Sequence, residues 1–199
     1  MIGPRLLKRL RRDERGATLT EFGFVAPVLC VLLMGIFDLA HTQYTAAQIN
    51  GAMQKAGRDM TLESAGSRQG TIDQAVIDQI KTVVPNNATV TLQKLSHFDF
   101  SDVGEAENFT DDDGDSVCNN GEPFEDANGN GQWDANRGAS GIGGARDAVL
   151  YEATVEWPRL FPMAGLVGMS ENMTLKASTV LRNQPYDQQN RNVEIGNCP

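Results

Sequence analysis

Side chains that carry oxygen atoms crowd into one stretch of this chain. Between Leu95 and Asn136 the sequence contains twelve Asp and Glu residues and neither Lys nor Arg. Within that stretch, residues 126–134 read DANGNGQWD, which puts oxygen-bearing side chains at loop positions one, three and five, Gly at six and Asp at nine. This order is typical of loops that bind Ca2+, because the tight turn at the Gly folds alternate side chains around one point. The predicted ligands are Asp126, Asn128, Asn130, the Gln132 carbonyl and Asp134.

Residues 111–122 repeat the pattern less completely and read DDDGDSVCNNGE. The predicted ligands there are Asp111, Asp113, Asp115, the Val117 carbonyl and Glu122 at position twelve. Ser116 stands where calcium loops usually have Gly. In the later loop Arg137 falls at position twelve, so a closing carboxylate has to come from elsewhere, and Glu122 and Glu125 are near enough for the loops to share. We expect a calcium site of hard oxygen ligands, which disfavours zinc; the alternative is a solvated acidic loop without metal.

The elements that must position these loops are strands and amphipathic helices. Residues 88–95 are rich in β-branched side chains, residues 149–157 alternate apolar and polar, and residues 175–181 form a third candidate strand. A helix is predicted from Thr71, because Thr71 and Gln74 form a capping box, and Pro85 stops it. Its apolar stripe is Ile72, Val76, Ile80 and Val83. We expect an α+β fold with a small, antiparallel sheet.

A longer helix is predicted upstream. No charged residue occurs from Phe22 to Phe37, and a run of this length approaches what a helix needs to cross a bilayer. Beyond it, a second stripe indicates that the helix continues for more than forty residues and packs on the sheet until Gly66 and Gly70 end it. That stripe is Ile49, Met53, Ala56 and Met60. Six basic residues precede the apolar run, which predicts a cytoplasmic N-terminus.

The border between the basic and apolar parts resembles the type IV prepilin cleavage signature. The resemblance implies a cut between Gly16 and Ala17 by a prepilin peptidase, which would make Glu21 the fifth residue of the mature chain. In pilins that carboxylate pairs with the N-terminal amine of a neighbouring subunit during assembly. The alternatives are a Glu resting at the headgroup level, and a removable secretory signal that ends near residues 45–47.

Several short runs are together similar to the TadE-like proteins of tight-adherence (Tad) pilus systems. They are RGATLTEF at 15–22, APVL at 26–29, MGIFD at 34–38, LFPMAG at 160–165 and STVLRNQPY at 178–186. The resemblance implies a minor pilin-like subunit or assembly factor of a Tad-type pilus and secretion system. Other pilin-like subunits would pack on its N-terminal helix. It also implies the bacterial inner membrane, with the C-terminal domain in the periplasm or, after assembly, at the cell surface. The alternative is a single-pass calcium-binding periplasmic domain that never enters a filament.

These features together predict the domain organisation. We expect a leader at 1–16, a transmembrane and stalk helix at 17–65, a soluble domain at 66–182 with an acidic insertion at 99–137, and a poorly structured tail at 183–199.

The net charge limits the functions that remain. Loss of the leader would remove six basic and two acidic side chains and take the net charge from −9 to −13, which argues against nucleic-acid binding. No nucleophile, phosphate-loop or Cys/His motif indicates an enzyme.

Two of the three cysteines, Cys118 and Cys198, lie outside the apolar run. On the oxidising side of the membrane they are expected to form a disulfide that pins the tail to the acidic segment. Pairing with another protein is the alternative.

Overall fold

The computed structural model describes residues 15–61, 65–161, 165, 168–184 and 193–199. The chain forms two compact units. One contains Met1–Gln43 with Arg159–Glu171, and the other contains Tyr44–Pro158 with Asn172–Pro199. Most of the predicted leader, residues 1–14, lies outside the described residues.

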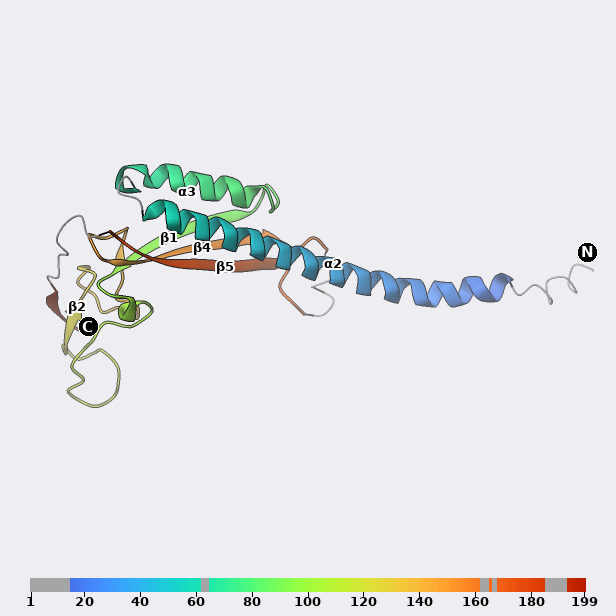
Figure 1. Ribbon diagram of the computed structural model, residues 1–199. Coiled ribbons are helices and arrows are strands. Elements are labelled where there is room, and N and C mark those ends of the chain that lie inside the picture. Colours follow the sequence, from blue (N-terminus) through green and yellow to red (C-terminus); the bar gives the residue numbers. More distant parts are fainter. Residues whose placement is uncertain (1–14, 62–64, 162–164, 166–167, 185–192) are drawn as a thin grey trace, which may run out of the picture. The chain divides into compact units, whose positions relative to one another are not determined.

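One long helix, α2 (Arg15–Met60), contributes to both units (Figure 1). Its 46 residues confirm the prediction of a single helix of more than forty. The predicted stripe Ile49, Met53, Ala56 and Met60 is buried. The helix ends before Gly66 and Gly70, which lie in the next helix and therefore do not terminate this one.

The next helix, α3 (Ala65–Lys81), begins six residues earlier than predicted. The capping box expected at Thr71 is wrong as a helix start, because the chain is already helical there. Its N–H groups therefore face the carbonyls of the preceding turn. Three of the four predicted stripe residues, Ile72, Val76 and Ile80, are buried in α3, whereas Val83 lies beyond the last helical residue, Lys81, and is only partly buried.

The main sheet is antiparallel throughout and has the strand order β3-β1-β4-β5. The strands are β1 (Thr89–His97), β3 (Ala139–Ser140), β4 (Ala148–Pro158) and β5 (Asn172–Arg182). The α+β fold class with a small antiparallel sheet is therefore confirmed. The alternation predicted for residues 149–157 is confirmed, because the apolar residues at every second position are buried: Val149, Tyr151, Ala153, Val155 and Trp157.

One face of the sheet carries the apolar core, which it shares with α3 and the second half of α2 (Figure 1). A polar contact also ties α3 to the sheet. The Tyr151 hydroxyl donates to Asp73 at 2.7 Å, and the Lys94 ammonium lies 2.6 Å from the other oxygen of that carboxylate. Burial raises the pKa of Tyr151 far above its usual value, and the hydrogen bond to Asp73 and the charge of that carboxylate act in the same direction.

Residues 99–137 and 193–198 of the second unit form a lobe with a sheet of its own, which we call the acidic lobe. It contains the 3-10 helix η1 (Phe100–Asp102) and a two-stranded sheet of β2 (Pro123–Asp126) and β6 (Glu194–Asn197). The prediction of a poorly structured tail is wrong for residues 194–197, because they pair antiparallel with β2. Residues 185–192 of the predicted tail lie outside the described residues.

The acidic lobe has its own small apolar cluster. Cys118, Phe124 and Cys198 are buried, and Phe109 and Trp133 pack against them. The predicted disulfide between Cys118 and Cys198 is present, with Cα atoms 5.3 Å apart. Gly196 is required opposite Phe124, because a Cβ at this position would collide with the aromatic ring.

Candidate functional site

The two predicted calcium loops, the first loop (Asp111–Glu122) and the second loop (Asp126–Arg137), share a set of equivalent backbone hydrogen bonds. In each loop the carboxylate at position one accepts N–H groups from the residues three and five places later. For Asp111 these distances are 2.6 and 3.0 Å, and for Asp126 they are 2.7 and 2.8 Å. The carboxylate at position one therefore organises both turns in the same way.

Positions three and five also correspond between the loops. In all four cases the side-chain oxygen accepts the N–H of the residue two places later, at 2.7–3.2 Å. The accepting residues are Asp113, Asp115, Asn128 and Asn130, and the donors at position seven are Val117 and Gln132. These bonds turn the polar side chains of each loop toward its own interior.

Backbone conformation completes the correspondence. Positions four and six have positive φ in both loops, and three of these four residues are Gly: Gly114, Gly129 and Gly131. The fourth is Ser116, with φ of 63°. The first loop therefore makes the expected turn without the usual Gly, at the cost of a left-handed conformation that a residue with a Cβ disfavours.

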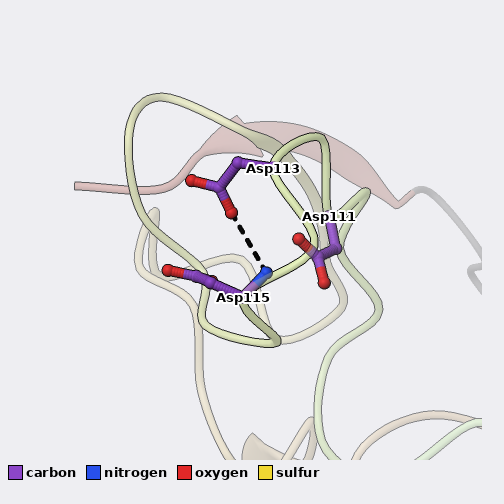
Figure 2. Close-up of side chains that lie close together, drawn as sticks. All are labelled: Asp111, Asp113 and Asp115. Carbon is purple, nitrogen blue, oxygen red and sulfur yellow. Dashed lines mark hydrogen bonds between the residues drawn. The ribbon is translucent and has the colours of Figure 1, made fainter.

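The structure brings three of the predicted ligands of the first loop together. One carboxylate oxygen each from Asp111, Asp113 and Asp115 lies within 4.8 Å of the other two, and all three residues are exposed (Figure 2). The dashed line in Figure 2 is the 3.2 Å hydrogen bond from the Asp115 N–H to Asp113. A divalent cation would relieve the repulsion between these charges.

The second loop gathers its ligands through amide groups. Asp134 at position nine accepts the side-chain amides of Asn128 and Asn130 at 2.8 and 2.6 Å. In the first loop the direction is reversed, because Asn119 at position nine donates to Asp115 at 2.7 Å. The first loop therefore brings together carboxylate oxygens, the donor type that Ca2+ prefers, whereas in the second loop the amide groups of two Asn residues converge on the Asp134 carboxylate.

A buried carboxylate closes each loop, and only one of the two stands at position twelve. Glu122 is 3% exposed and accepts the N–H groups of positions two and nine of the first loop, at 2.7 and 3.3 Å. Glu107 is 2% exposed and accepts the N–H groups of the same two positions of the second loop, at 2.9 and 3.0 Å. Glu107 thus occupies in the second loop the place that Glu122 occupies in the first.

Glu107 is not among the ligands that the sequence predicts. Glu122 and Glu125 are the carboxylates expected to close the second loop, but Glu122 closes the first loop. Glu125 accepts the side-chain amide of Asn108 at 2.8 Å and lies 3.6 Å from the Arg137 guanidinium. Glu107 precedes the second loop by nineteen residues, so no loop pattern includes it. The one local signal is its position beside Phe109, an apolar residue within the acidic stretch.

Outside the acidic lobe, the predicted processing and assembly residues lie at the start of α2. Gly16 and Ala17 are in its first turn, and both Gly16 and Glu21 are exposed. The helix is long and apolar enough to cross a membrane, and no residue of its most apolar stretch is buried within the molecule. Large apolar side chains from Leu19 to Leu39 are exposed, which is stable only in lipid or against other apolar helices.

The family model for TadE-like proteins matches residues 16–58. This segment is TadE-like. The match begins at Gly16 and includes Glu21, the apolar run and most of the buried stripe of α2, so it confirms the resemblance seen in the N-terminal sequence. No curated protein and no solved structure matches the chain.

The acidic lobe lies entirely outside the TadE-like segment. The family match therefore carries no information about either loop, and the argument for metal binding rests on the loops themselves. The matched segment also excludes the runs at 160–165 and 178–186. Their resemblance to TadE-like proteins therefore remains a prediction.

Proposed function

We propose that this protein is a minor pilin-like subunit or assembly factor of a Tad-type pilus and secretion system. The observation that carries the proposal is that the TadE-like segment contains an apolar helix whose most apolar stretch has no buried residue in the part of the chain that the structure describes. In the bacterial inner membrane lipid would cover this helix, and in a filament the helices of other subunits would. The basic residues before it favour a cytoplasmic N-terminus and a periplasmic domain. The proposal assigns no catalytic step to this chain.

Processing between Gly16 and Ala17 by a prepilin peptidase is the first part of this proposal. Gly16 is exposed and has no neighbouring atom within 4 Å of where a Cβ would lie, so a peptidase could approach the backbone there. Intact mass of the protein from native cells should lack sixteen residues. A chain that keeps them, or one that starts at Gln48, would contradict this part.

Glu21 is proposed to act in assembly rather than in insertion. Removing a charge from the membrane border should not impair insertion, whereas the amine of a neighbouring subunit would lose its counter-charge. We expect Glu21→Ala to insert normally and to abolish pilus output. Asp78→Ala, at an exposed carboxylate of α3, is the matched control. Normal output from the Glu21→Ala strain would argue against the role.

We also propose that the acidic lobe binds Ca2+. Support comes from the equivalent hydrogen bonds of the two loops and from their all-oxygen donor sets, in which Asp111, Asp113, Asp115 and Glu122 would hold one ion. Asp126, Asn128, Asn130, Asp134 and Glu107 would hold the other, and the position-seven carbonyls of Val117 and Gln132 would complete the two sets. Sites in extracellular modules typically have dissociation constants of about 0.1–1 mM. At ten times that constant, binding to the folded state alone would add about 1.4 kcal/mol of stability.

Melting of the full chain in chelator, magnesium and millimolar calcium tests the metal proposal. Calcium should raise the melting temperature more than magnesium does. Asp126→Ala and Glu107→Gln should reduce that calcium-dependent increment, whatever they do to the melting temperature in chelator. Asp112→Ala is the control, because this exposed side chain falls between ligand positions. Equal effects of calcium, magnesium and added salt on the melting temperature would contradict the proposal and mean that the lobe folds as an acidic structure without a specific metal.

A calcium-binding periplasmic protein that is anchored by one helix and never enters a filament is the alternative. The acidic lobe favours it, because the lobe lies outside the TadE-like segment. An unprocessed N-terminus together with calcium-dependent stability would select this alternative.

A further inference from the structure

The loop between β4 and β5 is unusually apolar. Residues 159–171 read RLFPMAGLVGMSE, so a charged residue occurs only at each end. The loop belongs to the same compact unit as the first half of α2. Leu160 is 49% exposed and Met169 is 54% exposed, while Phe161 is half-buried. Residues 162–164 and 166–167 lie outside the described residues.

The base of this apolar loop is fixed to α2 by an ion pair. The Arg159 guanidinium lies 2.7 Å from the Asp38 carboxylate, and the two side chains are only 15% and 19% exposed. Arg159 also closes the loop on itself, because its Nε donates to the Ser170 carbonyl at 3.0 Å and its backbone N–H donates to the Glu171 carbonyl at 2.9 Å. The loop is therefore held beside Asp38 from both of its ends.

Asp38 marks the far end of the apolar run of α2. The uncharged stretch from Phe22 to Phe37 has sixteen residues, which as a helix span about 24 Å. A typical hydrocarbon core is about 30 Å thick. A stretch this short draws its flanking charges toward the hydrocarbon or thins the bilayer locally. The partly buried pair with Arg159 neutralises the Asp38 charge at the border of the hydrocarbon, where an unpaired charge is unfavourable.

We infer that Leu160, Phe161 and Met169, the described large apolar residues of this loop, contact the lipid of the outer leaflet in the interfacial region, with Arg159 at the headgroup level. This rests on the proposed membrane-anchored function and extends it to a second lipid contact. Two observations select lipid as the occupant. The Arg159–Asp38 pair holds the exposed apolar side chains next to the anchor, and the short apolar run of α2 places this end of the anchor close to the hydrocarbon. In the periplasm these side chains would otherwise remain in water, which is unfavourable.

Site-directed fluorescence on the full chain in phospholipid vesicles tests the inference. In a Cys30→Ser background that keeps the disulfide, single cysteines replace Leu160 or Met169 and carry an environment-sensitive label. Labels at Leu32, in the apolar run, and at Thr174, an exposed residue of β5, are the references. We expect the labels at Leu160 and Met169 to shift to the blue, to be quenched by nitroxides high on the acyl chains, and to lose the iodide quenching found at Thr174.

The references separate failure of this inference from failure of the anchor. If Leu32 is quenched by lipid while Leu160 and Met169 are quenched by iodide as strongly as Thr174, the loop is in water and the inference is overturned, but the anchor stands. If Leu32 is also open to iodide, both are overturned. Shielding of Leu160 and Met169 from both quenchers that disappears on dilution in lipid would assign the loop to a second copy of this chain.

A further substitution tests the role of the Arg159–Asp38 ion pair. Arg159→Gln should move the Met169 label toward water, because it frees the loop base and leaves Asp38 without its partner. Lys176→Gln removes a comparable ion pair, to Glu152 at 3.2 Å, on the exposed face of the main sheet and should leave the label where it is. An unchanged label depth in Arg159→Gln would overturn the role of this pair in holding the loop.

Discussion

The main sheet and the acidic lobe belong to the same compact unit, yet different interactions stabilise them. The sheet buries an apolar layer against two helices. The lobe buries only Cys118, Phe124 and Cys198, and it also buries three carboxylates, those of Glu107, Glu122 and Asp126. Each of these carboxylates accepts several backbone N–H groups.

The difference shows how a polar segment can fold with little apolar surface. Hydrogen bonds to charged groups are worth about 1.5–3 kcal/mol each, but a buried charge also carries a large desolvation penalty. The lobe therefore depends on its disulfide far more than the sheet depends on any single covalent link. The chain also provides a reporter for each region, since its two tryptophans are Trp133 in the lobe and Trp157 in the sheet core.

The largest effect is expected from the disulfide. Cys118→Ser opens a loop with a sequence separation of 80 residues, which the chain-entropy model values at about 4–5 kcal/mol. Denaturant unfolding followed at Trp133, in a Trp157→Phe background, should show most of this loss, because both cysteines and strand β6 belong to the acidic lobe. Cys30→Ser, at the free cysteine, is the control. An equal loss at Trp157 would mean that lobe and sheet unfold as one.

The corresponding perturbation of the main sheet is a cavity in its apolar core. Met53 is fully buried, and Met53→Ala should lower the free energy of unfolding by about 2–5 kcal/mol. The Trp157 signal should report this loss, and Gln54→Ala at the neighbouring exposed position should change little. A loss confined to Trp133 would contradict the division between the two regions.

The same contrast explains which features the sequence predicts. Helix α2 and strand β4 each repeat apolar residues at fixed intervals, because one face of each element is buried in the same core. Local periodicity in the sequence therefore identifies both elements. The start of α3 is not marked in this way, because Gly66 and Gly70 lie inside a helix that is stabilised by packing further along.

In the acidic lobe, the local order of residue types in the sequence predicts the two loops, but it does not predict which carboxylate closes the second loop. Strand β6 has four residues without an alternating pattern, and it exists because a disulfide and a long-range pairing hold it against β2. The position of Glu107 likewise follows from how the chain before β2 packs, since Trp133 donates to the Glu107 carbonyl at 2.8 Å. Such contacts join residues far apart in the sequence and have no periodic signature.

An intermediate effect is expected from pH on the sheet. The pKa of Tyr151 is raised in the folded state, so in the unfolded chain this hydroxyl ionises first, near pH 10. The stabilising contribution is therefore complete below about pH 10 and is lost as pH rises further, by up to about 1.4 kcal/mol per pH unit. Unfolding at Trp157 should show this alkaline loss, and Tyr151→Phe should flatten it. A slope that survives in Tyr151→Phe would assign the loss to other groups.

The smallest effect compares the two loops directly. Ser116 and Gly131 both occupy position six with positive φ, 63° and 78°. A left-handed conformation costs a residue with a Cβ about 1–2 kcal/mol, and a glycine avoids this cost. Glycine also has more conformational freedom in the unfolded chain, which offsets about half of the stabilisation. Ser116→Gly should therefore stabilise the lobe by about 0.5–1 kcal/mol at Trp133. Gly131→Ser should destabilise it by a similar amount through strain alone, because no atom lies within 4 Å of the added Cβ. If both substitutions change stability in the same direction, the two loops do not share one backbone geometry.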